Sequence, residues 1–504
     1  MAGVFGSEGD PLAIADMTKS TTPAADPMVA DLPWGAAMIA TVCVYYAVSS
    51  LALSLAFLVL LAYLCWRRTS LAVSLIPLAI PYYLVPKHLH RHLDFSLGET
   101  VIVLCGILVA LKLLLGLRDL PPGVSLRRYL LPDTPFLWPA LVFLAAATLA
   151  SLAAQFPTVA HRQYRLVVLE PLLFFWLVLQ TLRGPDGAVR LLLSLIGSAL
   201  VVAGMAVVEI VFRSQDLVLA ANVGGAPQHL VQAVFKDQNS LALLLDHALP
   251  AALALALLPG WVGIWARGRQ AAPGAMAARI GLLAVSAFLL YILYRTGSRG
   301  GELTAAICVL LVFVYWQRER PWLIGAGAVV VALAALVERH RLEIFAGSGH
   351  GLSNLAHTSI WQSALNMIRD HPILGVGPDN FLYYYSNDST CAPGHIAHWY
   401  YVQAGTNFER CISHPHNLFL DFWLSTGVVG LAAALWLIGL FAFLGVRGWL
   451  AAPAQWSGPL LGALLVMVAI VVHGEVDNSY FLPDLSVIFW LCLGVASLWE
   501  RRVA

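Results

Sequence analysis

Residues 416–446 read HNLFLDFWLSTGVVGLAAALWLIGLFAFLGV. After Asp421 the segment carries no charged side chain. It is longer than the roughly 20 apolar residues that a helix needs to cross the hydrocarbon core of a bilayer. We therefore predict a membrane-spanning helix that tilts or breaks near Gly427 and Gly430.

The whole chain shares this apolar character. Of its 504 residues, 60% are hydrophobic and 11% are charged, and the mean hydropathy is +0.78. Soluble domains carry about a quarter charged residues, so lipid must solvate much of this sequence. The net charge of +1 gives no reason to expect a nucleic-acid partner.

Apolar runs of membrane-spanning length recur along the chain. The predicted spans are 70–87, 98–117, 136–155, 166–182, 189–211, 240–258, 279–295, 301–316, 321–337, 416–446, 457–474 and 483–499. Residues 34–66 form a further apolar stretch, which is either one long tilted helix or two short ones. The predicted fold is all-α and polytopic, with about 12–14 transmembrane helices and one large extracytoplasmic loop.

The predicted organisation follows from these runs. Residues 1–33 form a polar, disordered tail without the basic and apolar regions of a signal peptide. Transmembrane helices occupy 34–337, the large loop occupies 338–415, and further transmembrane helices occupy 416–504. Most arginines between spans, among them Arg68, Arg190 and Arg501, fall on one side of the alternation. That side is predicted to be cytoplasmic, which places the loop outside.

Basic residues also occur on the predicted outer face, against this trend. Arg162, Arg165, Arg295 and Arg299 lie near helix ends, and eight of the fifteen histidines fall between His340 and His416. An anionic ligand would explain such a set. The plainer interpretation is that each arginine reaches lipid phosphate from the interface.

The first chemical motif is Tyr294–Gly301, a short turn of sequence YRTGSRGG between two apolar helices. Glycine lets the backbone approach a ligand closely, and the N-terminus of the next helix attracts anions. Arg299 adds a planar fork suited to phosphate oxygens, so the turn is a candidate pyrophosphate site that includes Ser298 and Arg295. The alternative is a tight turn capped by Ser298.

The second motif, His414–Asp421, begins the long apolar helix. A helix N-terminus favours the neutral form of histidine, which a general base needs near neutral pH. His416 and His414 are therefore candidate catalytic residues, and Asn417 is expected to cap the helix or orient a ring. The alternative is an ordinary helix cap with an interfacial histidine.

Two further motifs suggest scaffold. In Phe235–Ala242, Asn239 or Ser240 is expected to cap the following helix, and Lys236 lies beside it. Residues 361–381 predict an amphipathic helix that ends in the Pro/Gly turn DHPILGVGP.

In this order, the four motifs resemble the O-antigen ligase and polymerase superfamily of bacterial membrane glycosyltransferases. The family pattern is a Phe-x-x-x-Asn-x-x-Ala helix start, a Thr-x-Ser-Arg-Gly turn, a Pro-Ile/Leu-Leu-Gly-Val-Gly segment in a large periplasmic loop, and a His-Asn-x-x-Leu helix followed by Thr-Gly-x-x-Gly-Leu. The matching residues are Phe235, Asn239, Ala242, Thr296, Ser298, Arg299, Gly300, Pro372 to Gly377, His416, Asn417, Leu420, Thr426, Gly427, Gly430 and Leu431. The resemblance covers roughly residues 230–445.

The resemblance implies a metal-independent glycosyltransferase without cofactors in the bacterial inner membrane. Its donor would be a glycan on undecaprenyl pyrophosphate, and its acceptor a hydroxyl at the periplasmic face. Arg299 would hold the pyrophosphate, and His416, with His414 beside it, would be the base. The family usually has a second arginine just before the Phe-x-x-x-Asn segment, which this chain lacks. Candidate replacements are Arg213, His229, Lys236 or the pair Arg162 and Arg165.

Alternatives remain at this stage. A ligase would use lipid A-core as acceptor, a polymerase another lipid-linked repeat, and a protein O-oligosaccharyltransferase a serine or threonine. A secondary transporter would instead keep its charges near the bilayer midplane. A metal protein would use histidine pairs such as His395/His398 and His414/His416, but no complete ligand set of known spacing is apparent. Cys391 and Cys411 in the outer loop are predicted to form a disulfide.

Overall fold

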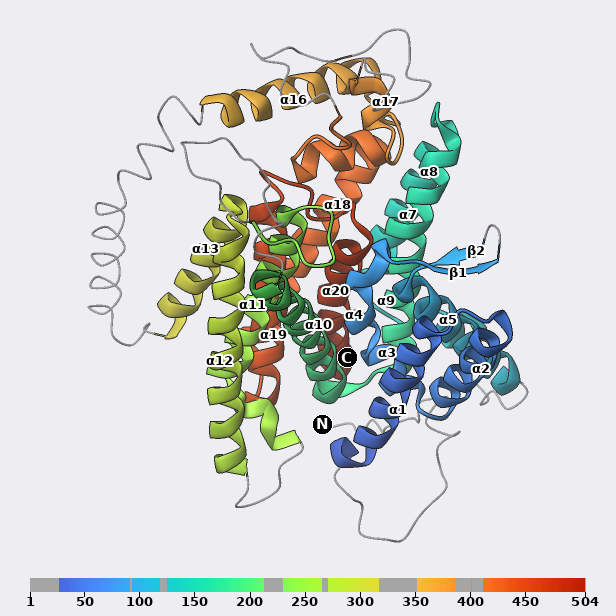
Figure 1. Ribbon diagram of the computed structural model, residues 1–504, viewed down its shortest axis with the longest axis vertical. Coiled ribbons are helices and arrows are strands. Elements are labelled where there is room, and N and C mark those ends of the chain that lie inside the picture. The colour runs from blue at the N-terminus through green and yellow to red at the C-terminus, as the bar shows by residue number, and fades with distance from the viewer. Residues whose placement is uncertain are drawn as a thin grey trace, which may run out of the picture.

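The computed structural model describes residues 27–90, 93–117, 125–212, 230–264, 271–316, 351–386, 400 and 411–503. Over these residues the chain is a bundle of helices beside one small hairpin (Figure 1). The helices are α1 Pro27–Ala47, α2 Leu51–Arg67, α3 Thr69–Ser74, α4 Ile76–Ala79, η2 Ile80–Leu84, α5 Leu97–Gly116, α6 Leu126–Leu130, α7 Leu137–Ala153, α8 Pro157–Tyr164, η4 Arg165–Leu169, α9 Glu170–Thr181, α10 Gly184–Phe212, α11 Gln238–Leu257, η5 Pro259–Ile264, α12 Ala271–Thr296, α13 Arg299–Trp316, α16 Gly351–Asp370, α17 Phe381–Tyr385, α18 Leu418–Ala451, α19 Ala454–His473 and α20 Pro483–Val503. The hairpin pairs β1 Lys87–His90 with β2 Leu93–Phe95 in antiparallel fashion.

Eight segments of the described chain are long and apolar enough to cross a membrane. They are α5, the continuous run from α8 through η4 to α9, α10, α11, α12, α18, α19 and α20. The chain is therefore an all-α polytopic membrane protein, as predicted. The predicted span 321–337 lies outside the described residues, and so does much of the loop 338–415.

The predicted span 70–87 is wrong as a single helix. The structure divides it into α3, α4 and the 3-10 helix η2. Pro77 and Pro81 lie in this stretch, and proline lacks the amide hydrogen that a helix interior uses. Tyr82 leaves helical geometry, with φ −90° and ψ 23°.

Residues 34–66, whose helix number the sequence left open, belong to two helices. α1 ends at Ala47 and α2 begins at Leu51. The guanidinium groups of Arg67 and Arg68, at the end of α2, lie 5.9 and 5.5 Å from the ring centre of Trp34, so α2 returns alongside α1. α1 begins at Pro27, within the segment predicted to be a disordered tail.

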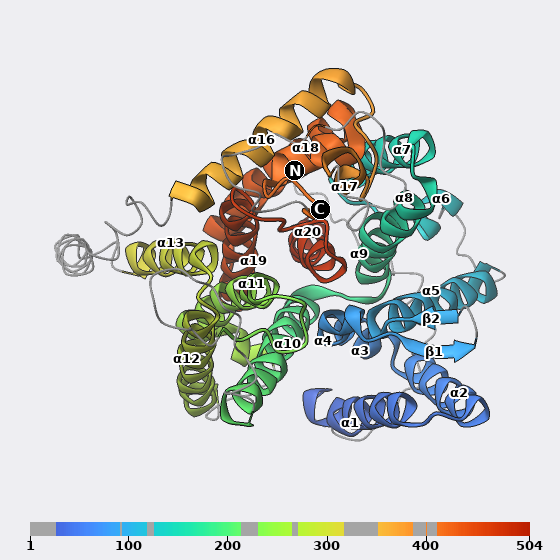
Figure 2. The ribbon, with the colours of Figure 1, turned by 45° about the horizontal axis from the view of Figure 1, so that its top comes forward.

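The most buried helices mark the core of the bundle. The apolar stretch of α20 is 89% buried and that of α11 is 83% buried, whereas that of α12 is only 22% buried. Figure 2 shows α20 at the centre, with α9, α10, α11 and α19 around it and α12 at the periphery. The exposed apolar side of α12 is suited to contact with lipid.

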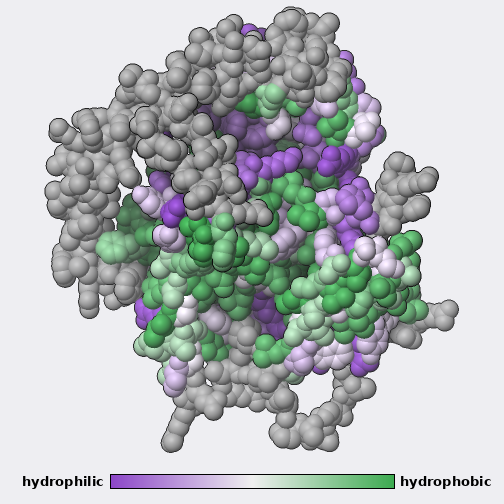
Figure 3. Space-filling model, in the orientation of Figure 1, coloured by the Kyte–Doolittle hydropathy of each residue, from purple (hydrophilic) through white to green (hydrophobic). Residues whose placement is uncertain are grey.

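The two ends of the bundle differ in chemistry. At one end Asp31 pairs with Arg190 at 2.6 Å and with Arg68 at 3.8 Å, and Arg501 donates to the carbonyl of Leu179. We call this the arginine end. At the other, the α16 end, α16 lies across the bundle (Figure 1). Figure 3 shows apolar side chains over the middle of one face and hydrophilic ones gathered above them, toward the α16 end.

Helix α18 breaks at Gly427, as predicted from the apolar run. Gly427 has φ 72°, in the left-handed region that favours glycine. A side chain here would collide with the carbonyl oxygen of Ile373. The break therefore requires a glycine both for its backbone angle and for the close approach of another segment.

The segment at the break is the Pro/Gly turn after α16. Val376 and Gly377 donate their amides to the carbonyl of Leu424, at 2.7 and 3.1 Å, and Val428 donates its amide to the carbonyl of Ile373 at 3.2 Å. These bonds satisfy polar backbone groups that the broken helix leaves unpaired. The turn is thus the scaffold that anchors α16 on α18.

Candidate active site

Asn417 begins α18 and places His416 immediately before the helix. Its Oδ1 accepts hydrogen bonds from the amides of Phe419 and Leu420, both at 3.1 Å, so the predicted cap is confirmed. His416 has φ 48°, an uncommon angle for a residue other than glycine. This sharp turn separates its backbone direction from that of the helix.

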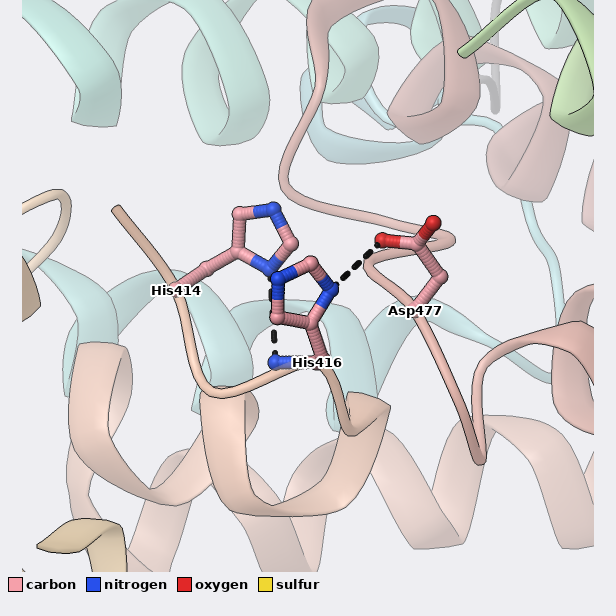
Figure 4. Close-up of side chains that lie close together, drawn as sticks. All are labelled: His414, His416 and Asp477. Carbon is pink, nitrogen blue, oxygen red and sulfur yellow. Dashed lines mark hydrogen bonds and ion pairs between the residues drawn. The ribbon is translucent and has the colours of Figure 1, made fainter. Parts of the chain in front are cut away.

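His416 is paired with a carboxylate that our sequence analysis did not identify. Its Nδ1 lies 3.1 Å from Oδ1 of Asp477, which lies in the loop between α19 and α20 (Figure 4). Asp477 is 7% exposed, and its amide donates to the carbonyl of His473 at 3.0 Å. The only sequence signal was an acidic residue in an outer loop, 475–482, and such residues are common.

The loop that carries Asp477 is tied to the start of α18. The amide of Leu418 donates to the carbonyl of Gly474 at 2.5 Å. Asn417 Nδ2 donates to the carbonyl and to Oε2 of Glu475, at 3.3 and 3.2 Å. These bonds fix the distance between His416 and Asp477.

His414 lies against His416, with ring centroids 4.3 Å apart. Its Nδ1 accepts the backbone amide of His416 at 3.4 Å, which requires a neutral ring nitrogen. Burial, helped by the neighbouring His416, lowers the pKa of His414 to about 3. For Asp477, burial raises the pKa, but the hydrogen bond and charge of His416 outweigh it and hold the pKa well below its usual range.

Helix α16 reaches the same histidine from the other side. The ring of His357 meets that of His416 edge to face at 5.5 Å, and Trp361 Nε1 donates to the carbonyl of His416 at 3.4 Å. Burial lowers the pKa of His357, and His416 adds to the effect. The base candidate is therefore enclosed between α16, α18 and the loop after α19.

His414, His416 and Asp477 also have the composition of a metal site. Their ligand atoms lie within 4.8 Å of one another. Three protein ligands are the number found at catalytic zinc sites. The second histidine pair, His395 and His398, lies outside the described residues.

The Ser-Arg-Gly turn forms the start of α13 at the α16 end. Gly297 has φ 66°, and Ser298 Oγ accepts the amide of Gly301 at 3.4 Å, so Ser298 caps the helix. Arg299 is the first residue of α13 and its side chain is exposed. Arg295 instead donates to the hydroxyl of Tyr291, one turn back along α12, at 3.2 Å.

Two further cations share one acidic neighbour. Burial raises the pKa of Asp379 to about 6, whereas the charges of Arg162 and Lys236 lower it. Gln163, next to Arg162, donates to the carbonyl of Phe481 at 2.6 Å, which holds α8 beside the loop that carries Asp477.

Arg165 lies in a different setting. It forms ion pairs with the buried carboxylates of Glu99 and Glu170, the latter at 3.5 Å. The structure therefore places Arg162 and Lys236 near Asp379, and pairs the partly exposed Arg165 with two buried carboxylates.

The remaining predicted residues are less informative. The prediction that Asn239 or Ser240 caps α11 is wrong, because Asp237 accepts the amide of Ser240 at 2.8 Å. A carboxylate two residues earlier can reach the same amides, and backbone geometry decides between them. Asn239 lies in the first turn of the helix and is half-buried. His229 and Arg213 lie outside the described residues.

A comparison with known families now bears on this site. Residues 283–435 match the family model described as O-antigen ligase. Over these residues the chain is similar to the O-antigen ligase family. The O-antigen ligase match runs from α12 into α18, so it contains Arg299, His414 and His416. Asp477 and Arg162 lie outside it.

A curated relative agrees with this assignment. An O-antigen ligase of Salmonella typhimurium strain LT2 is 29% identical over 197 residues, which are 36% of this chain and 43% of the relative. The matched part thus spans less than half of that O-antigen ligase. The superfamily is a class of enzymes.

Proposed function

We propose that this chain is a glycosyltransferase of the inner membrane that passes a glycan from undecaprenyl pyrophosphate to an acceptor hydroxyl at the periplasmic face. The observation that carries the proposal is the pair of His416 and Asp477 at one end of a membrane bundle. His416 lies within the region that matches the O-antigen ligase model, and Asp477 lies after it in the chain. A transporter would need its substrate groups near the middle of the membrane.

In the proposed reaction His416 is the general base. Its Nδ1–H donates to Asp477, which leaves the lone pair on Nε2 to accept the acceptor proton. The acceptor oxygen forms a bond to the anomeric carbon of the donor glycan. The bond from that carbon to the pyrophosphate oxygen breaks, and the lipid pyrophosphate leaves with the electron pair. Asp477 stabilises the imidazolium that results.

The donor pyrophosphate would lie at the start of α13. Arg299 offers a bidentate fork there, and the first amides of the helix add their partial positive charge. We assign the role of the second family arginine, which this chain lacks, to Arg162 and Lys236, whose charges both lower the pKa of Asp379. Arg295 and Arg165 are left out of this site because the structure engages them with Tyr291 and with Glu99 and Glu170.

Among the acceptors, lipid A-core is favoured because the curated relative is named an O-antigen ligase. Transfer to another lipid-linked repeat or to a protein hydroxyl would use the same base and the same leaving group. We further propose that the reaction is independent of metal, with His414, His416 and Asp477 acting through their hydrogen bonds.

The test is glycan transfer by the full chain in nanodiscs, from an undecaprenyl-pyrophosphate-linked glycan to lipid A-core, with and without EDTA. His416→Ala is expected to lose roughly a hundred- to ten-thousand-fold in rate, the usual contribution of a general base. Arg299→Lys is expected to be impaired as well, because an ammonium cannot reproduce the bidentate fork.

Two matched substitutions serve as controls. His88→Ala removes an exposed histidine from the hairpin, and Arg279→Lys changes an arginine of α12 distant from the turn. Both are expected to keep wild-type transfer. If the single variants His416→Ala and His414→Ala both keep full activity, the histidine mechanism is wrong. If EDTA abolishes activity and zinc restores it, the reaction depends on a metal.

A further inference from the structure

A carboxylate lies buried in the bundle below the proposed site and takes no part in the chemistry above. Asp246 of α11 is 0% exposed. Its Oδ1 lies 2.7 Å from Nδ1 of His247, and its Oδ2 lies 2.5 Å from Nδ1 of His473, at the end of α19. A buried carboxylate within a membrane bundle is costly unless it is paired, and such groups usually have a function.

His473 contacts both halves of the proposed site. Its backbone carbonyl accepts the amide of Asp477, the partner of His416. Its ring lies against Gly300, the residue after Arg299. A β-carbon added to Gly300 would lie 2.7 Å from Nε2 and 2.9 Å from Cδ2 of that ring.

This contact gives Gly300, the glycine of the Ser-Arg-Gly turn, a specific role. The sequence suggested that glycine in the Ser-Arg-Gly turn lets the backbone approach a ligand. At Gly300 the close neighbour is instead the ring of His473. The ring is 1% exposed, so it acts inside the protein and not on a substrate.

We propose that His473, anchored by Asp246, is a positioning residue that sets the Arg299 turn relative to the His416–Asp477 pair. The inference rests on the proposed function. The arginine must hold the leaving pyrophosphate while the base reaches the acceptor, and a displacement of about 1 Å can cost roughly a hundredfold in rate. The anchored ring of His473 fixes the turn at Gly300, and the backbone carbonyl of the same residue holds the amide of Asp477.

His247 provides the matched comparison. It bonds to the same carboxylate and is equally buried, but its other bond is to the carbonyl of Leu243 within α11. His473→Ala and His247→Ala therefore remove an imidazole from the same buried cluster. Only the first removes the contact to Gly300 and releases the end of α19 from Asp246, and the backbone carbonyl at this end of α19 accepts the amide of Asp477.

The experiment measures kcat, KM for the lipid-linked donor and the unfolding temperature of both variants in nanodiscs. For His473→Ala we expect kcat/KM to fall about a hundredfold, with a raised KM from the displaced Arg299 and a lowered kcat from the displaced Asp477. His247→Ala should keep its kcat/KM per folded molecule. Equal losses in both variants, in proportion to unfolding, would show that the cluster is only structural and would overturn the proposal.

A conservative substitution tests the proposal in case His473→Ala does not fold. His473→Asn can direct its amide nitrogen at Asp246 but leaves the space beside Gly300 empty. It is expected to show the rise in KM of His473→Ala, because the contact to Gly300 is lost, with a smaller fall in kcat, because the anchor on Asp246 is kept. Wild-type constants in a folded His473→Asn variant would contradict the proposal.

A double-mutant cycle tests the contact itself. Gly300→Ala should impair transfer because the new methyl group displaces the His473 ring. In the His473→Ala background no ring is present, so Gly300→Ala should add little further loss. Gly281→Ala, where the new methyl group meets open space, is the control. Additive losses would show that Gly300 and His473 act separately.

The variants Arg299→Lys and His416→Ala separate this inference from the proposed function. If Arg299→Lys and His416→Ala both retain full transfer, the site assignment fails, and the positioning role fails with it. If those variants are impaired and His473→Asn is not, only the positioning role is wrong.

Discussion

The pair of Asp477 and His416 joins a buried carboxylate to a partly exposed imidazole. The carboxylate is 10% exposed in its side chain and the imidazole 24%. A carboxylate in this position holds the histidine in one tautomer and stabilises its protonated form during reaction. In the proposed mechanism, Asp477 thus prepares His416 for proton transfer without needing to touch the substrate.

Asp477→Asn is the direct prediction at this scale. An amide cannot stabilise the imidazolium as a carboxylate does, so we expect the rate of glycan transfer to fall by about a hundredfold or more. Initial rates at saturating donor measure the effect. Glu475→Gln, which keeps an oxygen acceptor for Asn417, is the control and should remain near the wild-type rate. An unchanged rate for Asp477→Asn would remove the carboxylate from the mechanism.

His414 predicts a pH dependence of stability. Its pKa is about 3 in the folded protein, below the ordinary value of 6.5. Between these values the unfolded chain binds a proton that the folded chain does not, so this contribution to stability is full above pH 6.5 and is lost as the pH falls toward 3. The unfolding temperature in detergent should therefore drop from pH 7 to pH 4 less steeply for His414→Gln than for wild type. Parallel curves would contradict the prediction.

At the scale of elements, α18 depends on a break that another segment fills. We expect Gly427→Ala to lower the free energy of unfolding by about 1–3 kcal/mol, the usual cost of a strained backbone angle. The new methyl group would also collide with Ile373 and loosen the turn that anchors α16. The unfolding temperature measures this loss. Gly439→Ala, in the same helix but facing open space, should not lower it.

The loop between α17 and α18 supplies a second prediction about elements. Cys411 is disulfide-bonded, and Cys391, its predicted partner, lies outside the described residues. In the chain-entropy model a cross-link over a loop of this size stabilises by roughly 3 kcal/mol. Cys411→Ser should lower the unfolding temperature accordingly, and Cys43→Ser, at a free cysteine, should not. Alkylation of both loop cysteines in protein purified without reductant would reject the 391–411 pair.

At the scale of the whole molecule, the two ends of the bundle predict its orientation. The arginine end carries Arg68, Arg190 and Arg501, and positive charge is retained on the cytoplasmic side of membranes. The α16 end should then face the periplasm. Reporter fusions at Ser353, in α16, and after Ala504 should report opposite compartments. The same compartment for both would overturn the orientation.

Much of this molecule is determined by local sequence. The apolar runs predict the spanning helices because each helix satisfies its own backbone and needs only an apolar exterior in lipid. Asn417 as a cap and Gly427 as a break could be predicted for the same reason, since both depend on the residue's own backbone chemistry. The motifs around Arg299 and His416 likewise indicated the family whose model matches residues 283–435.

Tertiary structure decided which side chains meet. His416 and Asp477 are 61 residues apart in sequence, and His473 and Asp246 are 227 apart. No local pattern encodes such pairs, because a buried charge is stabilised by whichever partner the packing of distant helices brings within hydrogen-bond distance. The same physics placed Arg165 with Glu99 and Glu170, and gave Gly300 the ring of His473 as its neighbour. The sequence therefore determined the helices and the chemical groups, and the packing of the helices decided which distant partners the buried charges meet.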